Sequence, residues 1–225
     1  MKIEKTMQVI YLYGFASGPL SNKAQFFKRK FESVGVNFQI YDYVLNPHEF
    51  RDMKLSELQS NLHEYLSANF PNEKVILMGS SFGGLLVTWY AHLHPEKIDQ
   101  LILIAPALQF SAEFITETLD TSFQEWELKG ETEVEHYRFG GSIPLNYSFI
   151  KDIKQNPIPT FSRDDFPVST IIFHGENDQV VPHSWSISLA HANPRVDTYI
   201  MKGDHQLLNH RINMWNEIVS KFKLK

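Results

Sequence analysis

The stretch KVILMGSSFGGLL, residues 74–86, constrains the fold more than any other part of the sequence. Its apolar start predicts a buried strand, GSSFG follows at residues 79–83, and a helical pattern then continues until Pro95. The pattern G-x-S-x-G between a strand and a helix indicates a sharp turn that raises the Ser81 hydroxyl above the sheet edge. Gly79 and Gly83 are needed because larger residues would collide there. Ser81 is the predicted nucleophile, and Ser80 beside it is the alternative.

The rest of the chain alternates between strand-like and helix-like segments. Short apolar runs predict strands at residues 8–13, 37–41, 74–78, 100–104, 169–173 and 196–201. Apolar residues at helical spacing predict helices at residues 23–34, 55–70, 82–94, 183–191 and 206–222. Continuous apolar strands separated by helices are typical of a mostly parallel sheet with helices on both faces. We therefore expect a single α/β domain over residues 1–225.

Residues 109–160 interrupt this alternation, because they contain no clear strand and many aromatic residues. We interpret them as a short lid inserted at the carboxyl edge of the sheet. Ligand pockets are mostly apolar, so aromatic side chains of the lid are candidates for a substrate pocket. The candidates are Phe110, Trp126, Tyr137, Phe139 and Tyr147. The alternative is that these rings pack the lid onto the sheet.

A serine hydroxyl is a weak nucleophile at neutral pH, so Ser81 needs a base, and the base needs an orienting acid. His205 follows the predicted strand 196–201, and Asp178 follows the predicted strand 169–173. The order Ser, Asp, His along the chain is that of α/β-hydrolases.

Other residues near these two positions compete for the same roles. Glu176 is an alternative acid, and so is Asp204, although adjacent side chains rarely face each other as Asp204 and His205 would have to. His174 is predicted to be a packing residue at the end of its strand.

Two backbone N–H groups are needed to stabilise the oxyanion of an acyl-transfer reaction. One is expected from Phe82, the residue after the nucleophile. The second is expected from Phe15 in the turn YGFASGP, residues 13–19, where Gly14 lets the backbone turn toward Ser81. The alternative is an ordinary turn rich in glycine and proline.

Several segments carry a family resemblance that extends over nearly the whole chain. YLYGFASGPLSNKAQFF, MGSSFGG, PLNYSFIKDIKQ, HGENDQVVP and GDHQL resemble the α/β-hydrolase superfamily, and more narrowly the YqiA/YcfP-type small esterases of bacteria. They are also similar to the mitochondrial ABHD10-type thioesterases. The resemblance implies an α/β-hydrolase fold and hydrolysis of esters or thioesters with acyl groups, without a cofactor.

The same resemblance assigns a role to each matching residue. It implies that Ser81 is the nucleophile, Asp178 the acid and His205 the base, with oxyanion donors at Phe15 and Phe82. The sequence departs from the family pattern before the oxyanion phenylalanine. The family usually has His-Gly there, and this chain has Tyr13-Gly14.

Composition removes several other classes of function. The chain has no cysteine, a net charge of −5 and no run rich in lysine or arginine, so nothing indicates a thiolate nucleophile or a nucleic-acid partner. No convincing set of metal ligands is visible. No apolar stretch approaches the roughly 20 residues of a membrane span, and the first residues are a poor secretory signal, so we expect a cytoplasmic location. The oligomeric state is left open.

The predicted reaction is hydrolysis of a small-molecule carboxylic ester through an acyl-enzyme, and an acyl thioesterase or depalmitoylase is the nearest alternative. A non-catalytic binding member of the same fold is the alternative from another class. Residues 113–135 contain eight acidic residues and one lysine, which gives a local charge of −7. This charge is either a solvated helix face or a negative rim that disfavours anionic substrates such as CoA thioesters.

Overall fold

A six-stranded parallel sheet forms the centre of the protein, whose computed structural model describes residues 7–161 and 168–223. The strand order is β2-β1-β3-β4-β7-β8, and every neighbouring pair is parallel. The strands are β1 (Gln8–Leu12), β2 (Asn37–Ile40), β3 (Val75–Ser80), β4 (Ile98–Ile104), β7 (Ser169–Gly175) and β8 (Val196–Met201). The predicted parallel sheet is confirmed, and its apolar runs are explained because strands such as β3 are buried on both faces.

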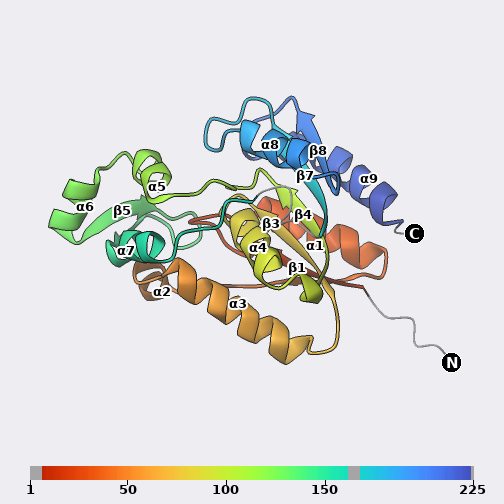
Figure 1. Cartoon of the computed structure of the whole chain (residues 1–225), viewed down its shortest axis with the longest axis horizontal. Helices are drawn as coiled ribbons and strands as arrows, with labels where there is room; N and C mark the ends of the chain where they lie inside the picture. Colours follow the sequence, from red (N-terminus) through yellow and green to blue (C-terminus); the bar gives the residue numbers. More distant parts are fainter. Residues whose placement is uncertain (1–6, 162–167, 224–225) are drawn as a thin grey trace.

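Helices cover both faces of the sheet (Figure 1). α1 (Asn22–Ser33) and α9 (Arg211–Phe222) pack on one face, where the rings of Phe31 and Trp215 lie 5.0 Å apart. On the other face lie α3 (Leu55–Asn69), α4 (Phe82–Leu93) and α8 (Ser184–Ala192). The two cores are separate because successive side chains of a strand point to opposite faces: Tyr11 belongs to the first core and Leu12 to the second.

The strand order creates a switch point between β1 and β3. From β1 the chain continues to β2 on one side, whereas β3 and the strands after it lie on the other side. The loops that leave the carboxyl ends of β1 and β3 therefore diverge, and such a crevice is where open α/β sheets bind ligands. Leu12 pairs in register with Gly79, so the two turns singled out in the sequence begin at the same level of the sheet.

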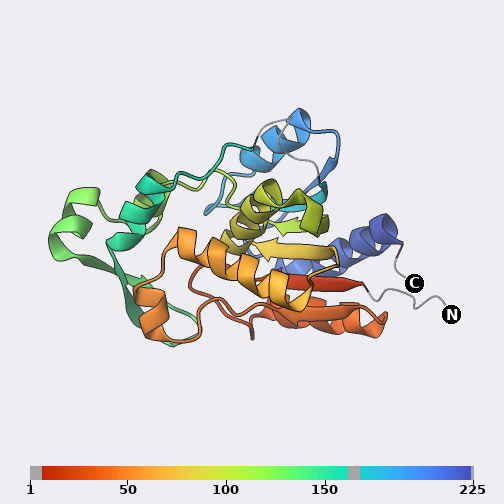
Figure 2. The same cartoon turned by 60° about the horizontal axis from the view of Figure 1, so that its bottom comes forward.

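The elements between β4 and β7 lie beyond one end of the sheet, where Figure 1 and Figure 2 show them in green to teal. They are α5 (Ala112–Thr118), α6 (Phe123–Lys129), β5 (Glu131–Glu135), β6 (Ser142–Asn146) and α7 (Ser148–Gln155). The expectation that residues 109–160 contain no clear strand is wrong, because β5 and β6 form an antiparallel hairpin. Val134 is the one buried residue of β5 and Leu145 the one of β6, so these strands lack the apolar run that marks the other strands.

Two other boundaries differ from the sequence expectations. A short helix, α2 (Pro47–Arg51), follows β2 and is capped by Asn46, whose side chain accepts hydrogen bonds from two backbone N–H groups. The closing helix α9 begins at Arg211 and not at residue 206, because Leu207 has a left-handed backbone with φ 50°. A 3₁₀ turn, η2 (Leu208–His210), joins the two, and another, η1 (Pro95–Lys97), precedes β4. His205 therefore lies in a loop.

Candidate active site

Ser81 lies on a strained turn between β3 and α4. Its backbone has φ 55° and ψ −117°, a conformation that costs a residue with a β-carbon about 1–3 kcal/mol. Three backbone hydrogen bonds hold it there. The Ser81 N–H donates to Ile104 O at 2.9 Å, and the Ser81 carbonyl accepts from Leu85 N at 3.1 Å and Ala107 N at 3.2 Å. The serine is thus fixed at the start of α4, where helix N–H groups favour negative charge.

The glycines around Ser81 are required by close backbone contacts. A β-carbon at Gly79 would lie 2.4 Å from Gly83 O, and one at Gly83 would lie 2.3 Å from Leu12 O. Both distances are far below van der Waals contact, which confirms the prediction that neither position tolerates a side chain. A β-carbon at Gly84 would lie 2.8 Å from Pro106, a third constraint that the motif alone did not indicate.

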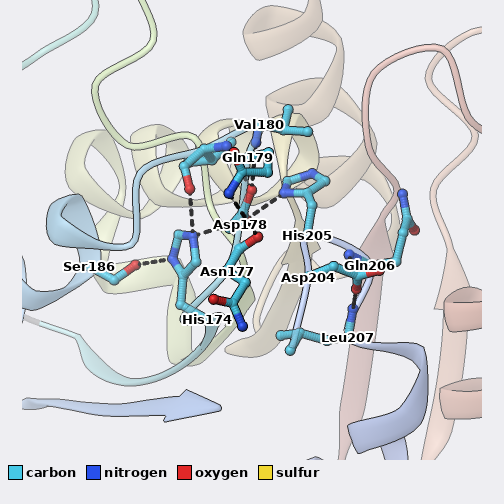
Figure 3. A network of polar contacts seen from close by, with 11 residues as sticks. His174, Asn177, Asp178, Gln179, Val180, Ser186, Asp204, His205, Gln206 and Leu207 are labelled. Atoms are coloured by element: carbon cyan, nitrogen blue, oxygen red, sulfur yellow. Dashed lines mark hydrogen bonds and ion pairs between the residues drawn. The ribbon is translucent and has the colours of Figure 1, made fainter. Parts of the chain in front are cut away.

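Asp178 and His205 meet across two neighbouring strand ends (Figure 3). Asp178 lies in the loop after β7 and His205 in the loop after β8, and His205 Nδ1 lies 2.7 Å from Asp178 Oδ2. Nδ1 donates to the carboxylate, so the tautomer that leaves Nε2 as an acceptor is the one favoured by this bond. The Asp178 side chain is fully buried, whereas 13% of the His205 side chain is exposed.

The Asp178 carboxylate accepts hydrogen bonds from four donors. Oδ1 accepts from the backbone N–H groups of Val180 and Val181, both at 2.8 Å, and Oδ2 accepts from His205 and from His174 Nε2 at 3.1 Å. Burial on its own would raise the pKa of Asp178. The hydrogen bonds from His174, His205 and Val181 outweigh it and hold the pKa well below its usual range. Asp178 is therefore ionised at neutral pH.

His174 contributes more to the site than the sequence indicated. It is fully buried at the end of β7, as a packing residue would be, but Nε2 also donates to Asp178 and to Val181 O at 3.0 Å. Its Nδ1 lies 2.7 Å from Ser186 Oγ, so the ring is held from both sides. The sequence holds no signal that separates this role from packing, because both place a histidine at the end of a buried strand.

The alternative residues are exposed or make other contacts. Glu176 is exposed, and Asp204 Oδ1 accepts hydrogen bonds from Gln206 N and Leu207 N, both at 3.0 Å, so that it caps its own turn. Ser80 is buried in β3, and its side chain interacts with that of Tyr11.

The loop after β1 is held by a network around Tyr13, the residue that replaces the usual histidine. The Tyr13 hydroxyl donates to Asp42 Oδ1 at 2.5 Å, and Arg138 donates to the same oxygen at 2.6 Å. The Tyr43 hydroxyl lies 3.1 Å from Tyr13 O and 3.2 Å from Gly14 O, and the rings of Tyr13 and Tyr43 stack at 4.4 Å. Because Arg138 belongs to the insertion, this network also ties the lid to the loop.

The predicted oxyanion donors lie on the two turns that face each other at the switch point. A β-carbon at Gly14 would lie 3.4 Å from the Ser81 β-carbon, so the turn of Phe15 passes directly beside Ser81. Within residues 7–161 and 168–223, neither the Phe15 nor the Phe82 N–H donates a hydrogen bond to a backbone carbonyl. Both groups are therefore available to an acceptor at Ser81.

A cavity of about 560 Å³ opens at these turns. Ser81, His205, Phe15 and Phe82 all line it, together with Phe110 and Tyr137 among the expected pocket residues. Phe114, another aromatic residue of the insertion, also lines it, and so do Ile115, Leu119, Val134 and Val181, which the sequence did not single out for the pocket. Most of this lining is apolar, as in most pockets that bind small molecules.

Three of the expected pocket residues pack inside the insertion and do not line this cavity. Trp126 is fully buried and donates its indole N–H to Leu145 O at 3.0 Å, and Tyr147 packs against it. Phe139 stacks on His136 at 4.3 Å. The alternative of lid packing holds for these three, because a hairpin and three short helices need a small core of their own.

The acidic charge of the insertion lies mainly on its outer surface. Of the eight acidic residues, Glu135 lines the cavity and Glu131 pairs with Arg51 at 3.2 Å. Most of the others are exposed. In the described part of the chain, no group of three or more histidines and carboxylates is arranged to hold a metal ion, and no helix is both long and apolar enough to cross a membrane.

The parallel sheet, the serine on its turn after β3 and the Asp–His pair at the same edge are the features of an α/β hydrolase, and solved structures agree. Mouse α/β-hydrolase domain-containing protein 10 superposes with a TM-score of 0.72 at 26% identity, covering 97% of this chain and 91% of that one. Est1E from Butyrivibrio proteoclasticus gives a TM-score of 0.77 at 19% identity, covering 98% and 88%. The protein has the α/β-hydrolase fold.

Within this class, the chain belongs to the uncharacterised protein family UPF0227, whose sequence profile matches residues 8–222. Mouse palmitoyl-protein thioesterase ABHD10, a mitochondrial protein, is 29% identical over 216 residues, which are 90% of this chain and 70% of that protein. The rat protein of the same name is 28% identical over 223 residues. These likenesses place the chain among the carboxylic ester and thioester hydrolases of this fold.

Proposed function

We propose that the protein hydrolyses carboxylic esters or thioesters through a covalent acyl-enzyme, with Ser81 as nucleophile, His205 as base and Asp178 as orienting acid. The observation that carries this proposal is the hydrogen bond of 2.7 Å between Asp178 and His205, which lines the same cavity as Ser81. A buried ionised carboxylate, a histidine with a fixed tautomer and a serine on a strained turn are the parts that serine acyl transfer needs.

The first half of the reaction forms the acyl-enzyme. The Ser81 hydroxyl attacks the substrate carbonyl and passes its proton to His205 Nε2, and Asp178 stabilises the resulting imidazolium. The N–H groups of Phe15 and Phe82 stabilise the negative oxygen of the tetrahedral intermediate. When this intermediate collapses, His205 gives its proton to the departing alcohol or thiol.

The second half of the reaction releases the acid. His205 takes a proton from a water molecule, which attacks the acyl-serine carbonyl through a second tetrahedral intermediate. The acid leaves, and His205 returns the proton to the Ser81 oxygen. No cofactor is needed for either half, because each step is a proton transfer joined to attack on a carbonyl.

A thioesterase is the second candidate, and the ABHD10 relatives named as palmitoyl-protein thioesterases favour it. The apolar lining around Phe110, Phe114 and Leu119 suits an acyl chain in either case. The mechanism is also the same for both classes, so only the relative rates separate them. The mammalian relatives are named as mitochondrial, and a cytoplasmic location for this chain remains a prediction from its sequence.

A fluorophosphonate probe tests whether the protein is a serine hydrolase at all. We expect labelling of the wild type, loss of labelling in Ser81→Ala and labelling retained in Ser80→Ala, as measured by intact-protein mass. An unlabelled wild type would favour a non-catalytic binding protein. Rates on matched p-nitrophenyl esters and acyl thioesters of graded chain length then decide between the two enzyme candidates.

A further inference from the structure

Lys23 is a buried cation that the proposed reaction does not use. It is the second residue of α1, only 8% of it is exposed, and it lines the same cavity as Ser81 and His205. Lysine is rarely buried to this extent unless its ammonium is paired. We therefore expect an anionic group to pair with the Lys23 ammonium.

No described residue of the protein supplies that partner through a hydrogen bond or an ion pair. Within the described ranges, no hydrogen bond or ion pair engages the Lys23 ammonium, although Asp178 and Asp204 are near enough to act on it electrostatically. Both carboxylates are already committed. Asp178 accepts four hydrogen bonds in the Asp–His network, and Asp204 caps the turn after His205.

The ammonium remains largely charged at neutral pH. Burial lowers the pKa of Lys23 to about 8, and the nearby carboxylates of Asp178 and Asp204 oppose this shift. At pH 7, roughly nine-tenths of the lysine is then protonated. A mostly buried charge without a hydrogen-bonded counter-ion is unfavourable, so an anion that enters the cavity gains a partner there.

Several polar residues line the cavity together with Lys23. They include Tyr11, Ser17, Ser21, Ser80 and Gln206, and Tyr11 belongs to the core on the α1 face of the sheet. The apolar lining residues, such as Phe82 and Phe110, belong to the core on the opposite face of the sheet from α1. The two ends of the cavity therefore suit two chemically different parts of one substrate.

The proposed reaction indicates which part of the substrate lies at each end of the cavity. The acyl chain fits the apolar end, and the leaving group must lie next to His205, which protonates it. His205 and Gln206 line the cavity together with Lys23. We propose, on the basis of the proposed hydrolase function, that the Lys23 ammonium binds a carboxylate on the leaving group, so that the protein prefers esters or thioesters whose alcohol or thiol part is anionic.

The acidic insertion is compatible with this preference. Its charge is carried mainly by exposed side chains, which act on a ligand before it enters, and Glu135 is its one acidic residue among the cavity-lining side chains of the described chain. A large polyanion is repelled by many of these exposed acidic side chains at once. A small leaving group with one carboxylate reaches Lys23 inside the cavity.

The test compares two nitrophenyl esters with the same acyl chain. One carries a carboxylate on the leaving-group ring, and the other carries a carboxamide at the same position. We expect the wild type to prefer the carboxylate in kcat/KM, and we expect Lys23→Met to reduce the ratio of the two values about tenfold, because the charged hydrogen bond is lost. Lys23→Arg keeps the charge and should keep a preference for the anionic ester.

Lys28→Met is the matched control. Lys28 lies on the same helix, is half exposed and pairs with Glu32 at 3.8 Å, and it does not line the cavity. For Lys28→Met, the ratio of the kcat/KM values for the two esters should equal that of the wild type. Thermal unfolding of all variants checks that each is folded, and a ratio of two substrates on one enzyme is insensitive to a partial loss of active protein.

Three outcomes overturn the inference while leaving the hydrolase proposal intact. The wild type could cleave both esters with equal kcat/KM, Lys23→Met could retain the ratio, or the preference could appear only for a carboxylate on the acyl chain. Failure of the hydrolase proposal looks different, because neither ester would then be cleaved and the fluorophosphonate probe would not label Ser81.

Discussion

The Nδ1 nitrogen of His205 lies 2.7 Å from Oδ2 of Asp178, although the two residues are 27 positions apart in the chain. β7 and β8 are parallel neighbours, with Gly175 paired to Met201, so the loops that follow them start at the same edge of the sheet. The sharp turns around Asp178 and His205 then bring the two side chains together. The left-handed Leu207 keeps His205 outside the closing helix and free to face the cavity.

Replacing the acid tests the role of this contact. Asp178→Asn should lower kcat by on the order of 10⁴-fold, because the amide can hold the histidine in the wrong tautomer and no longer stabilises its charged form. Steady-state kinetics on a p-nitrophenyl ester measures the effect. Asp204 lies next to His205 in the chain but does not share the Asp178 contact. Asp204→Asn is therefore the control and should retain most of the activity. An equal loss in both variants would contradict the assignment of Asp178.

The hydrogen bonds of Asp178 also predict how stability depends on pH. Its pKa is held well below the usual range in the folded protein, whereas an unfolded aspartate titrates near a pH of about 3.9. Ionised Asp178 therefore stabilises the fold above that pH, and this contribution is lost as the pH falls toward the folded pKa. Urea unfolding between about pH 5 and pH 2 should give a smaller loss of unfolding free energy for Asp178→Asn than for the wild type. Parallel curves would show that this carboxylate does not contribute.

Tyr43 is expected to position the loop that carries Phe15. Its hydroxyl is within hydrogen-bond distance of the carbonyls of Tyr13 and Gly14, directly before the proposed oxyanion donor. Tyr43→Phe keeps the ring stacking but removes these bonds, so we expect kcat to fall about tenfold with little change in KM. Tyr65→Phe loses the 2.7 Å hydrogen bond to Gln39 and is the control for the removal of a tyrosine hydroxyl. A similar loss in the control would point to a general effect of stability.

The sheet and the Asp–His contact were predictable because both follow from patterns within short segments of the sequence. Buried parallel strands are continuous apolar runs, and residues that directly follow them meet at one edge. Asp178 and His205 could be chosen from this rule and their order relative to Ser81. The contact of His174 with Asp178 was not predicted, because a buried histidine at a strand end has the same pattern whether it packs or donates.

The insertion could not be predicted to the same degree. Its aromatic residues have no period that separates a ring facing the cavity, such as Phe110, from one facing the small core of the lid, such as Trp126. That choice depends on how the β5–β6 hairpin folds back, and the hairpin itself has only one buried side chain in each strand. Lys23 was also missed, since a lysine in the first turn of an amphipathic helix looks like a surface residue.

Gly83 provides a test of the turn geometry by stability alone. A β-carbon there would lie 2.3 Å from Leu12 O, and backbone atoms on both sides cannot move apart without breaking the β1–β3 register. Gly83→Ala should therefore lower the free energy of unfolding by about 3 kcal/mol or prevent folding. Gly14→Ala is the control, because its nearest neighbour would be at an ordinary 3.4 Å. Equal stability of the two variants would contradict the described turn.

The charge of −7 between residues 113 and 135 predicts that kcat/KM for a large substrate depends on the charge of that substrate. An acyl-CoA carries several negative charges outside the cavity, where most of the insertion's acidic side chains are exposed, so repulsion should slow its association. We expect a lower kcat/KM for an acyl-CoA than for a neutral thioester with the same acyl chain. Because salt screens repulsion between exposed charges, the difference should shrink as ionic strength rises. Glu117→Gln combined with Glu133→Gln should reduce the difference at low salt. If the two thioesters react equally fast and neither rate responds to salt, the acidic residues form only a solvated surface, and substrate choice then depends on the cavity itself.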